Sequence, residues 1–117
     1  MKVNTAIILC AGYGKRLSPL TKDTPKPLLK IKNKNLLDNT INFIKSIGIN
    51  NIKINTFYLG DQINSFIKNK NYPLNINIVS DGEEILDTGG GIYNLIKNDN
   101  EENFITFNPD TLWNLKD

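Results

Sequence analysis

Short apolar runs alternate with stretches of helical periodicity along this chain. Val3 to Cys10 is short, mostly apolar and rich in β-branched residues, which predicts a buried strand. Asn51 to Phe57 alternates well enough to form a second strand. Asn75 to Val79 and Phe104 to Phe107 have the length and composition of a third and a fourth strand.

Three helices are expected between these strands. The clearest is Leu36 to Ile47, and Gly48 suits the C′ position that ends it. Asp61 is expected to cap a second helix, and a third should begin near Thr88 or Gly89. The apolar positions expected to face the core are Leu37, Ile41 and Ile44 in the first helix, Ile63, Phe66 and Ile67 in the second, and Ile92, Leu95 and Ile96 in the third.

The regular alternation of strand and helix predicts an α/β sandwich with a mostly parallel sheet. The 117 residues have room for one modest core, so residues 1–117 are expected to form a single domain. If the strand order is 3-2-1-4, the loops after the first and fourth strands face each other at the carboxyl edge of the sheet. That edge is where open α/β sheets bind ligands.

Prolines interrupt the chain between the first strand and the first helix. Pro19, Pro25 and Pro27 each fix φ and remove a backbone donor. We therefore expect residues 18–28 to be an ordered, irregular segment without a regular helix.

The charge balance excludes two classes of partner. Fourteen basic residues against twelve acidic ones give a net charge of +2, which does not indicate a nucleic-acid or membrane-surface protein. Six of the basic residues lie between Lys15 and Lys32, so an anionic ligand is expected to meet that segment.

Histidine is absent and Cys10 is the only cysteine. Ser-His and Cys-His nucleophilic catalysis are therefore excluded, as are an intramolecular disulfide and a multi-cysteine zinc site. The longest apolar run, Ala6 to Ala11, is far too short to span a bilayer, and together with the cysteine usage it suggests the cytoplasm. The sequence carries no signal for an oligomeric state.

A glycine-rich segment, Gly12 to Arg16, follows the first expected strand. Glycine permits φ > 0 and lets backbone amides approach phosphate oxygens, and Lys15 and Arg16 suit an anion. The P-loop spacing is missing, and Leu17 occupies the third glycine position of the dinucleotide fingerprint. On this segment alone, a polyphosphate-binding loop and a plain tight turn both remain open.

Lys26 stands between Pro25 and Pro27. Its backbone is restricted on both sides, so its ammonium group is presented from a stiff segment. A surface lysine seldom has such support, which favours a specific anion contact over a solvated lysine in a proline-rich loop.

Together, Ala11 to Arg16 and Pro25 to Pro27 resemble the signature of the sugar nucleotidyltransferase family. The resemblance to this family extends, in order, over essentially the whole chain. The resemblance implies a Rossmann-like three-layer sandwich of the nucleotide-diphospho-sugar transferase type. It also implies roles: Ala11, Gly12, Tyr13, Gly14 and Lys15 hold the base and phosphates of a nucleoside triphosphate, Arg16 neutralises the triphosphate, and Lys26 bridges the α-phosphate and the sugar phosphate.

A second glycine run, Thr88 to Ile92, precedes the third expected helix. It resembles the base-recognition segment of the subgroup around N-acetylmuramate-1-phosphate uridylyltransferase. That resemblance assigns Thr88 and Gly89 to nucleotide binding and favours UTP over GTP or dTTP.

Asn108, Pro109 and Asp110 follow the fourth expected strand. One carboxylate near a triphosphate suits a Mg²⁺ ion that keeps several waters. Asn-Pro-Asp is also a favourable sequence for a simple turn at the end of a strand, and that alternative remains open. In the family the matching aspartate binds the metal, Mg²⁺ or Mn²⁺, so the resemblance assigns Asp110 to the metal and Asn108 to the nucleotide. Proline at 109 departs from the usual glycine or serine.

The expected reaction is in-line attack by an oxygen of a sugar 1-phosphate on the α-phosphorus, with pyrophosphate leaving. An ionised phosphate needs no histidine base, so positioning and charge stabilisation suffice. Family members are longer, so residues 1–117 are expected to be the nucleotide-binding part of a larger domain. A nucleotide-binding or regulatory module without the reaction is the main alternative. A glycosyltransferase would carry Asp-x-Asp where Asn108 stands, and a dehydrogenase would need the missing glycine.

Overall fold

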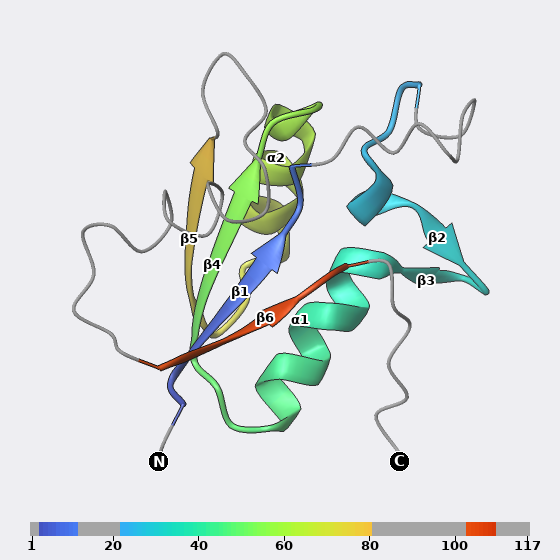
Figure 1. Cartoon of the computed structure of the whole chain (residues 1–117). Helices are drawn as coiled ribbons and strands as arrows, with labels where there is room; N and C mark the ends of the chain where they lie inside the picture. Colours follow the sequence, from blue (N-terminus) through green and yellow to red (C-terminus); the bar gives the residue numbers. More distant parts are fainter. Residues whose placement is uncertain (1–2, 12–21, 81–102, 110–117) are drawn as a thin grey trace.

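The computed structural model describes residues 3–11, 22–80 and 103–109 of the chain. Within these ranges lie a four-stranded sheet, a two-stranded hairpin, two α-helices and a 3-10 turn (Figure 1). The elements in chain order are β1 (Thr5–Leu9), η2 (Lys26–Leu28), β2 (Lys30–Ile31), β3 (Lys34–Asn35), α1 (Leu36–Ser46), β4 (Asn51–Thr56), α2 (Gly60–Lys70), β5 (Asn75–Ser80) and β6 (Phe104–Phe107).

The larger sheet has the order β5-β4-β1-β6, and all of its pairs are parallel. If the four strands of this sheet are numbered 1 to 4 along the chain, the observed order is 3-2-1-4. The expected order is therefore confirmed. Thr5 is in register with Asn51 of β4 on one side and with Phe104 of β6 on the other. The carboxyl ends of β1 and β6 therefore lie side by side.

Central strand β1 is buried on both of its faces. Ile7 and Ile8 point to opposite faces of the sheet, and both are 0% exposed. This burial explains why the strand is a nearly continuous apolar run and does not alternate, as is usual for the inner strands of parallel sheets.

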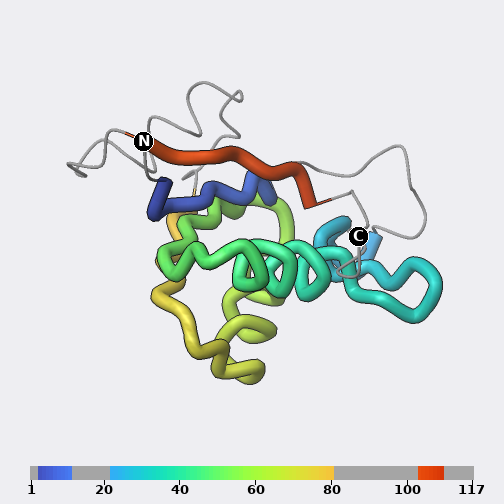
Figure 2. Tube along the Cα trace, turned by 90° about the horizontal axis from the view of Figure 1, so that it is seen from below, coloured from blue at the N-terminus to red at the C-terminus, as the bar shows by residue number. Residues whose placement is uncertain are grey.

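Both α-helices lie on the same face of the sheet (Figure 2). The core between them and the strands contains Ile8 of β1, Ile54 of β4, Ile41 of α1 and Ile63 of α2, all 0% exposed. The expected inward residues of the first helix, Leu37, Ile41 and Ile44, are all buried, as is Ile63 of the second, with Phe66 and Ile67 packed against the same core.

Helix α1 is defined at both ends by its own sequence. The side chain of Asn35 accepts a hydrogen bond from the Asp38 amide at 2.9 Å and so caps the N-terminus. At the other end, Gly48 has φ +88°, and the Ile49 amide donates to the Ile44 carbonyl at 3.3 Å. The positive φ of Gly48 and the bond from Ile49 to Ile44 are those of a Schellman motif, so the expected C′ role of Gly48 is confirmed.

Helix α2 begins two residues earlier than expected, and the expectation that Asp61 caps it is wrong. Leu59 occupies the N-cap position in the left-handed conformation, with φ 52°, and makes no side-chain capping bond. Gly60 is the first helical residue because the helix approaches β4 so closely there. Asp61 lies inside the first turn, where its negative charge interacts favourably with the positive end of the helix dipole.

The segment before α1 contains two features that the sequence did not predict. Residues 22–28 form no α-helix, as expected, but Lys26–Leu28 is a 3-10 turn. The hairpin of β2 and β3 turns through Lys32 and Asn33, which have φ 53° and 64°. Two consecutive positive φ values are typical of the tight type I′ turn. The usual Asn-Gly or Asp-Gly signal is absent here, which is why the hairpin was missed.

Two of the three expected layers are described: the sheet and the helices on one face. The helix expected near Thr88 or Gly89 lies outside the described residues. No helix within the described ranges is long and apolar enough to cross a membrane.

Candidate functional site

The exit from β1 is fixed by a buried side chain of the neighbouring strand. The Cys10 amide donates to Asn55 Oδ1 at 2.7 Å, and Asn55 is only 4% exposed. This bond satisfies the first backbone donor beyond β1, which explains why the strand ends at Leu9 and not at Cys10 as expected. Ala11 follows at the carboxyl edge of the sheet and is 6% exposed.

The Lys26 turn is anchored by the prolines on either side. Pro25 and Pro27 are both buried, whereas Lys26 is partly exposed. The Leu28 amide donates to the Pro25 carbonyl at 2.9 Å, and the Leu29 amide donates to the Lys26 carbonyl at 3.1 Å. The backbone of Lys26 is therefore fixed, and the residue is partly exposed.

The start of α1 supports the Lys26 turn from one side. Asn35, the capping residue of α1, donates from Nδ2 to the Leu28 carbonyl at 3.2 Å. The Leu36 amide donates to the Leu29 carbonyl at 3.0 Å. Since α1 begins at the carboxyl edge of the sheet, η2 lies close to the end of β6 (Figures 1 and 2).

Strand β6 delivers a polar residue to the same edge. Ile8 is in register with Phe107, the last residue of β6, and the Phe107 ring packs edge-on against Phe43 of α1 with centroids 6.2 Å apart. Asn108 then lies exposed, and Pro109 is buried in the turn that follows. The side chain of Asn108 is thus available beside the exit of β1.

The comparison with protein families identifies the class of site. The family model for nucleotidyl transferase matches residues 5–115. The chain belongs to the nucleotidyl transferase family.

Relatives within this family differ in the nucleotide named. The N-acetylmuramate alpha-1-phosphate uridylyltransferase of Neisseria meningitidis serogroup B is 36% identical over 108 residues, covering 92% of this chain and 47% of that protein. The D-glycero-alpha-D-manno-heptose 1-phosphate guanylyltransferase of Aneurinibacillus thermoaerophilus is 35% identical over 108 residues, covering 92% of this chain and 46% of that protein.

A solved structure supports the same fold. HddC from Yersinia pseudotuberculosis, complexed with GMP-PN, superposes with a TM-score of 0.81 at 28% identity, over 92% of this chain and 48% of that one. The chain thus spans about half the length of these three proteins. The expected Rossmann-like nucleotidyltransferase fold is confirmed.

The structure brings together three of the site residues expected for a nucleotidyltransferase. Ala11 and Asn108 lie at the carboxyl edge of the sheet, as the topology required, and Lys26 belongs to η2, which lies close to the end of β6 (Figures 1 and 2). Their roles in binding remain predictions. The other expected site residues lie outside the described ranges: Gly12, Tyr13, Gly14, Lys15, Arg16, Thr88, Gly89 and Asp110.

Cys10 is an inert part of this edge. Its side chain is 2% exposed, and burial raises the pKa of its thiol far above the usual value. The thiol stays protonated and cannot serve as a nucleophile or a thiolate metal ligand.

Asp110, the residue expected to hold the metal, lies outside the described ranges, and its role remains a prediction. Among the described residues, no three acidic, cysteine or histidine side chains gather into a cage. A family metal held by one carboxylate, phosphate oxygens and waters requires no such cage. Of the two residues that precede Asp110, Asn108 is exposed and Pro109 is buried.

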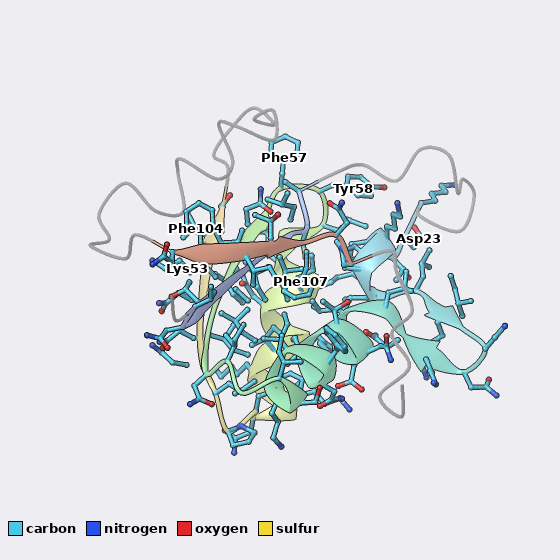
Figure 3. All side chains as sticks on the ribbon, turned by 60° about the horizontal axis from the view of Figure 1, so that its bottom comes forward. Asp23, Lys53, Phe57, Tyr58, Phe104 and Phe107 are labelled. Carbon is cyan, nitrogen blue, oxygen red and sulfur yellow. The ribbon has the colours of Figure 1, made fainter. Side chains whose placement is uncertain are left out.

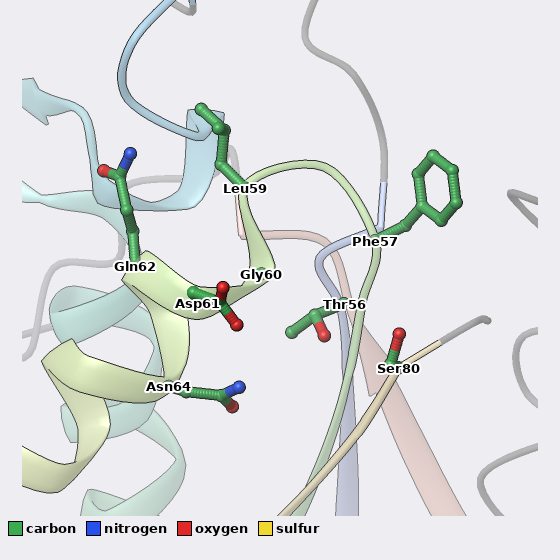
Figure 4. Close-up of a pocket in the computed structure, with 8 residues that line it drawn as sticks. All are labelled: Thr56, Phe57, Leu59, Gly60, Asp61, Gln62, Asn64 and Ser80. Atoms are coloured by element: carbon green, nitrogen blue, oxygen red, sulfur yellow. The ribbon is translucent and has the colours of Figure 1, made fainter. Parts of the chain in front are cut away.

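A pocket of about 400 Å³ opens at the ends of β4 and β5, where α2 begins. Figure 4 shows Asp61 and Asn64 extending from α2 toward Thr56 and Ser80. The lining is mixed polar and apolar and includes the Asp61 carboxylate, so it suits hydroxyl or amino groups better than phosphate. The residues that line it are Thr56, Phe57, Leu59, Gly60, Asp61, Gln62, Asn64 and Ser80.

Sequence reasoning missed the side chains that hold the end of β1 and the segment before Lys26 in place. Asn55 carried a signal, because an amide at a buried strand position must satisfy its polar groups. Tyr58 and Gln62, in the connection that follows β4, carried none, because their contacts are with residues far away in the sequence.

Proposed function

We propose that residues 1–117 form the nucleotide-binding part of an enzyme that joins a nucleoside monophosphate to a sugar 1-phosphate. The observation that carries the proposal is the Lys26 turn: a partly exposed lysine between two buried prolines, at the edge where β1 and β6 end. A cation held on a fixed backbone can stabilise charge on a reacting phosphate without first having to reorganise.

The reaction follows from what the site holds. An oxygen of the sugar 1-phosphate attacks the α-phosphorus, the bond from the α-phosphorus to the bridging oxygen breaks, and pyrophosphate leaves with those electrons. Lys26 would lie between the two anions and Arg16 beside the triphosphate, while the backbone at Ala11 to Gly14 would hold the nucleotide. Asp110 would hold Mg²⁺, which supplies positive charge at the phosphates.

UTP is the proposed nucleotide. The support is the resemblance of Thr88 to Ile92 to the uridylyltransferase subgroup and the 36% identity to the Neisseria uridylyltransferase. The guanylyltransferase relative is almost equally similar, so GTP is the competing substrate. The names of these relatives suggest N-acetylmuramate 1-phosphate and a heptose 1-phosphate as first acceptors to test.

Nucleotide binding and pyrophosphate release test the proposal. The chain would be incubated with Mg²⁺, each of UTP, GTP, CTP and dTTP, and each acceptor, and nucleotide binding would be measured in parallel by calorimetry. We expect the chain to bind UTP, and the enzyme of which it is proposed to be the nucleotide-binding part to release pyrophosphate with UTP. Binding without release by that enzyme for every pair would support the alternative of a nucleotide-binding module, and absence of nucleotide binding would refute the proposal.

Lys26→Ala tests the central residue. We expect a loss of about 2–4 kcal/mol of transition-state stabilisation in kcat/KM, because one preorganised cation is removed from the reacting phosphate. The control is Lys34→Ala, which removes an exposed lysine from the hairpin that follows. Equal activity of both variants would remove Lys26 from the mechanism.

A further inference from the structure

The connection between β4 and α2 grips the chain on both sides of the glycine-rich segment. We call residues 55–62 the β4–α2 corner. Asn55 accepts the Cys10 amide at 2.7 Å, before that segment. Tyr58 and Gln62 hold Lys22 and Asp23, after it. One structural element therefore fixes two points of the chain that lie twelve residues apart in sequence.

The second grip consists of two hydrogen bonds to adjacent main-chain carbonyls. Tyr58 Oη donates to the Lys22 carbonyl at 3.0 Å, and Gln62 Nε2 donates to the Asp23 carbonyl at 2.7 Å. Figure 3 shows Tyr58 projecting toward the segment that carries Asp23. Because both acceptors are backbone atoms, the bonds fix the path of the chain and not the side chains at 22 and 23.

The corner is closely packed at one contact. Thr56 is 2% exposed, and a Cβ on Gly60 would lie only 3.0 Å from Thr56 Oγ1. Leu59 turns the chain with φ 52°. This contact constrains the backbone on both sides of Tyr58, and the hydrogen bonds of Tyr58 and Gln62 tie the segment at Lys22 and Asp23 to that backbone.

The gripped carbonyls lie close to Lys26 along a stiff stretch of chain. Only Thr24 and the buried Pro25 separate Asp23 from Lys26. Pro25 has φ −66° and ψ 146°, an extended conformation in which a displacement is passed along the chain. Asn35 and Leu36 hold the far side of the turn through Leu28 and Leu29. The chain is thus held on both sides of Lys26, by the β4–α2 corner before it and by the start of α1 after it.

We infer that Tyr58 and Gln62 are positioning residues, which set where the Lys26 ammonium lies relative to the exit of β1. The inference rests on the proposed function, in which Lys26 meets the α-phosphate. A misplacement of about 1 Å at a reacting group costs on the order of a hundredfold in rate. The two bonds are exposed and contribute little to global stability, so their main effect is on the placement of Lys26.

Two substitutions remove the grip with little change in shape. Tyr58→Phe removes one hydroxyl, and Gln62→Glu exchanges the amide donor for a carboxylate that cannot donate. We expect each to lower kcat by about tenfold and to change KM for the nucleotide by less than about threefold, because the nucleotide loop keeps its own support at Asn55. Gln62→Arg, which restores a donor, should recover most of the activity.

Hydrogen exchange gives a readout that does not depend on catalysis. The amides of Leu28 and Leu29 close the Lys26 turn. In Tyr58→Phe and Gln62→Glu they should exchange about tenfold faster, which corresponds to about 1.4 kcal/mol of lost local protection. The Gly48 and Ile49 amides at the other end of α1 should be unchanged.

Matched controls separate positioning from general weakening of the fold. Tyr72→Phe also removes a tyrosine hydroxyl bond, which joins the chain just beyond α2 to Asp38 of α1, and Ser65→Asp adds a charge to the exposed side of α2. Both should leave kcat and the exchange of Leu28 and Leu29 unchanged.

The outcomes distinguish this inference from the proposed function. If wild type releases no pyrophosphate, the proposed function fails, and the exchange of Leu28 and Leu29 alone decides whether the corner positions the turn. If wild type is active and both corner variants match it in kcat and in exchange, the inference is overturned. It is equally overturned if the control variants show the same losses as the corner variants.

Discussion

Asn55 shows how much a single buried amide can decide at the residue scale. Its Oδ1 is the acceptor for the Cys10 amide, and the side chain is 4% exposed. Asn55→Leu would leave that buried donor without a partner, because leucine has similar volume and no acceptor. We expect the free energy of unfolding to fall by about 1–3 kcal/mol, measured by urea denaturation.

The control for Asn55 is another amide of the same strand. Asn51 accepts a hydrogen bond from Asn75 Nδ2 at 3.1 Å, but this pair is exposed to solvent. Asn51→Ala should change stability by less than about 0.5 kcal/mol. A similar loss in the two variants would mean that burial of the Cys10 bond contributes nothing.

The Cys10 thiol should be protected from modification. The side chain is 2% exposed, and this burial raises the pKa of the thiol and keeps it protonated. A disulfide reagent can therefore reach the thiol only when the edge of the sheet opens. We expect slow labelling by Ellman's reagent in buffer at neutral pH and fast labelling in concentrated guanidinium chloride. Equally fast labelling of the native protein would contradict the burial.

At the element scale, the close contact between the start of α2 and the end of β4 depends on Gly60. A Cβ at this position would meet Thr56 Oγ1 at 3.0 Å and Thr56 Cβ at 3.2 Å. We expect Gly60→Ala to destabilise the protein by about 1 kcal/mol, because a neighbour must shift to make room. The loss should be smaller in a Thr56→Ala background, where the nearest atom is gone. A double-mutant cycle by urea denaturation measures this coupling.

Gly48 provides the contrasting case. No described atom lies within 4 Å of a Cβ placed there, but its φ is +88°. Gly48→Ala should therefore destabilise through backbone strain of about 1–2 kcal/mol, and Thr56→Ala should give no relief. Coupling between Gly48 and Thr56 equal to that between Gly60 and Thr56 would refute the packing explanation.

Regular elements with a clear period were predictable, whereas elements stabilised by distant contacts were not. The stripe of Leu37, Ile41 and Ile44 predicted α1 because a helix with one buried face must repeat apolar residues at that spacing. The start of α2 was misassigned because the contact between Gly60 and Thr56 is invisible in local propensity. The β2–β3 hairpin was missed because Lys32 and Asn33 are unusual residues for its turn.

At the scale of the whole molecule, the topology was predictable and the support of the site was not. Alternating strands and helices with right-handed connections leave few sheet orders, and the order 3-2-1-4 brings Ala11 and Asn108 to one edge. Lys26 was recognisable from the two prolines beside it. Its support by Tyr58 and Gln62 depends on residues 36 and 39 positions apart, which no sequence pattern reports.

The two helices that cover the sheet are joined at one further point, which should make the stability of the whole molecule depend on pH. Tyr72 donates a hydrogen bond to Asp38 of α1, and Lys70 Nζ lies 3.8 Å from the same carboxylate. Burial, the hydrogen bond and the Asp38 charge all raise the pKa of Tyr72 above its ordinary value of 10.0. The folded protein therefore keeps this phenol protonated at pH values where the unfolded chain releases the proton.

The sign of the pH effect follows from that difference. Below about pH 10 both states carry the proton and the contribution of Tyr72 is complete, whereas above it only the unfolded chain ionises and stability is lost. Wild type should thus lose stability more steeply than Tyr72→Phe as the pH rises above about 10, measured by urea denaturation at each pH. The comparison with Tyr72→Phe removes every contribution that the two proteins share. Parallel profiles for wild type and Tyr72→Phe would show that the phenol is no more protected in the folded protein than in the unfolded chain.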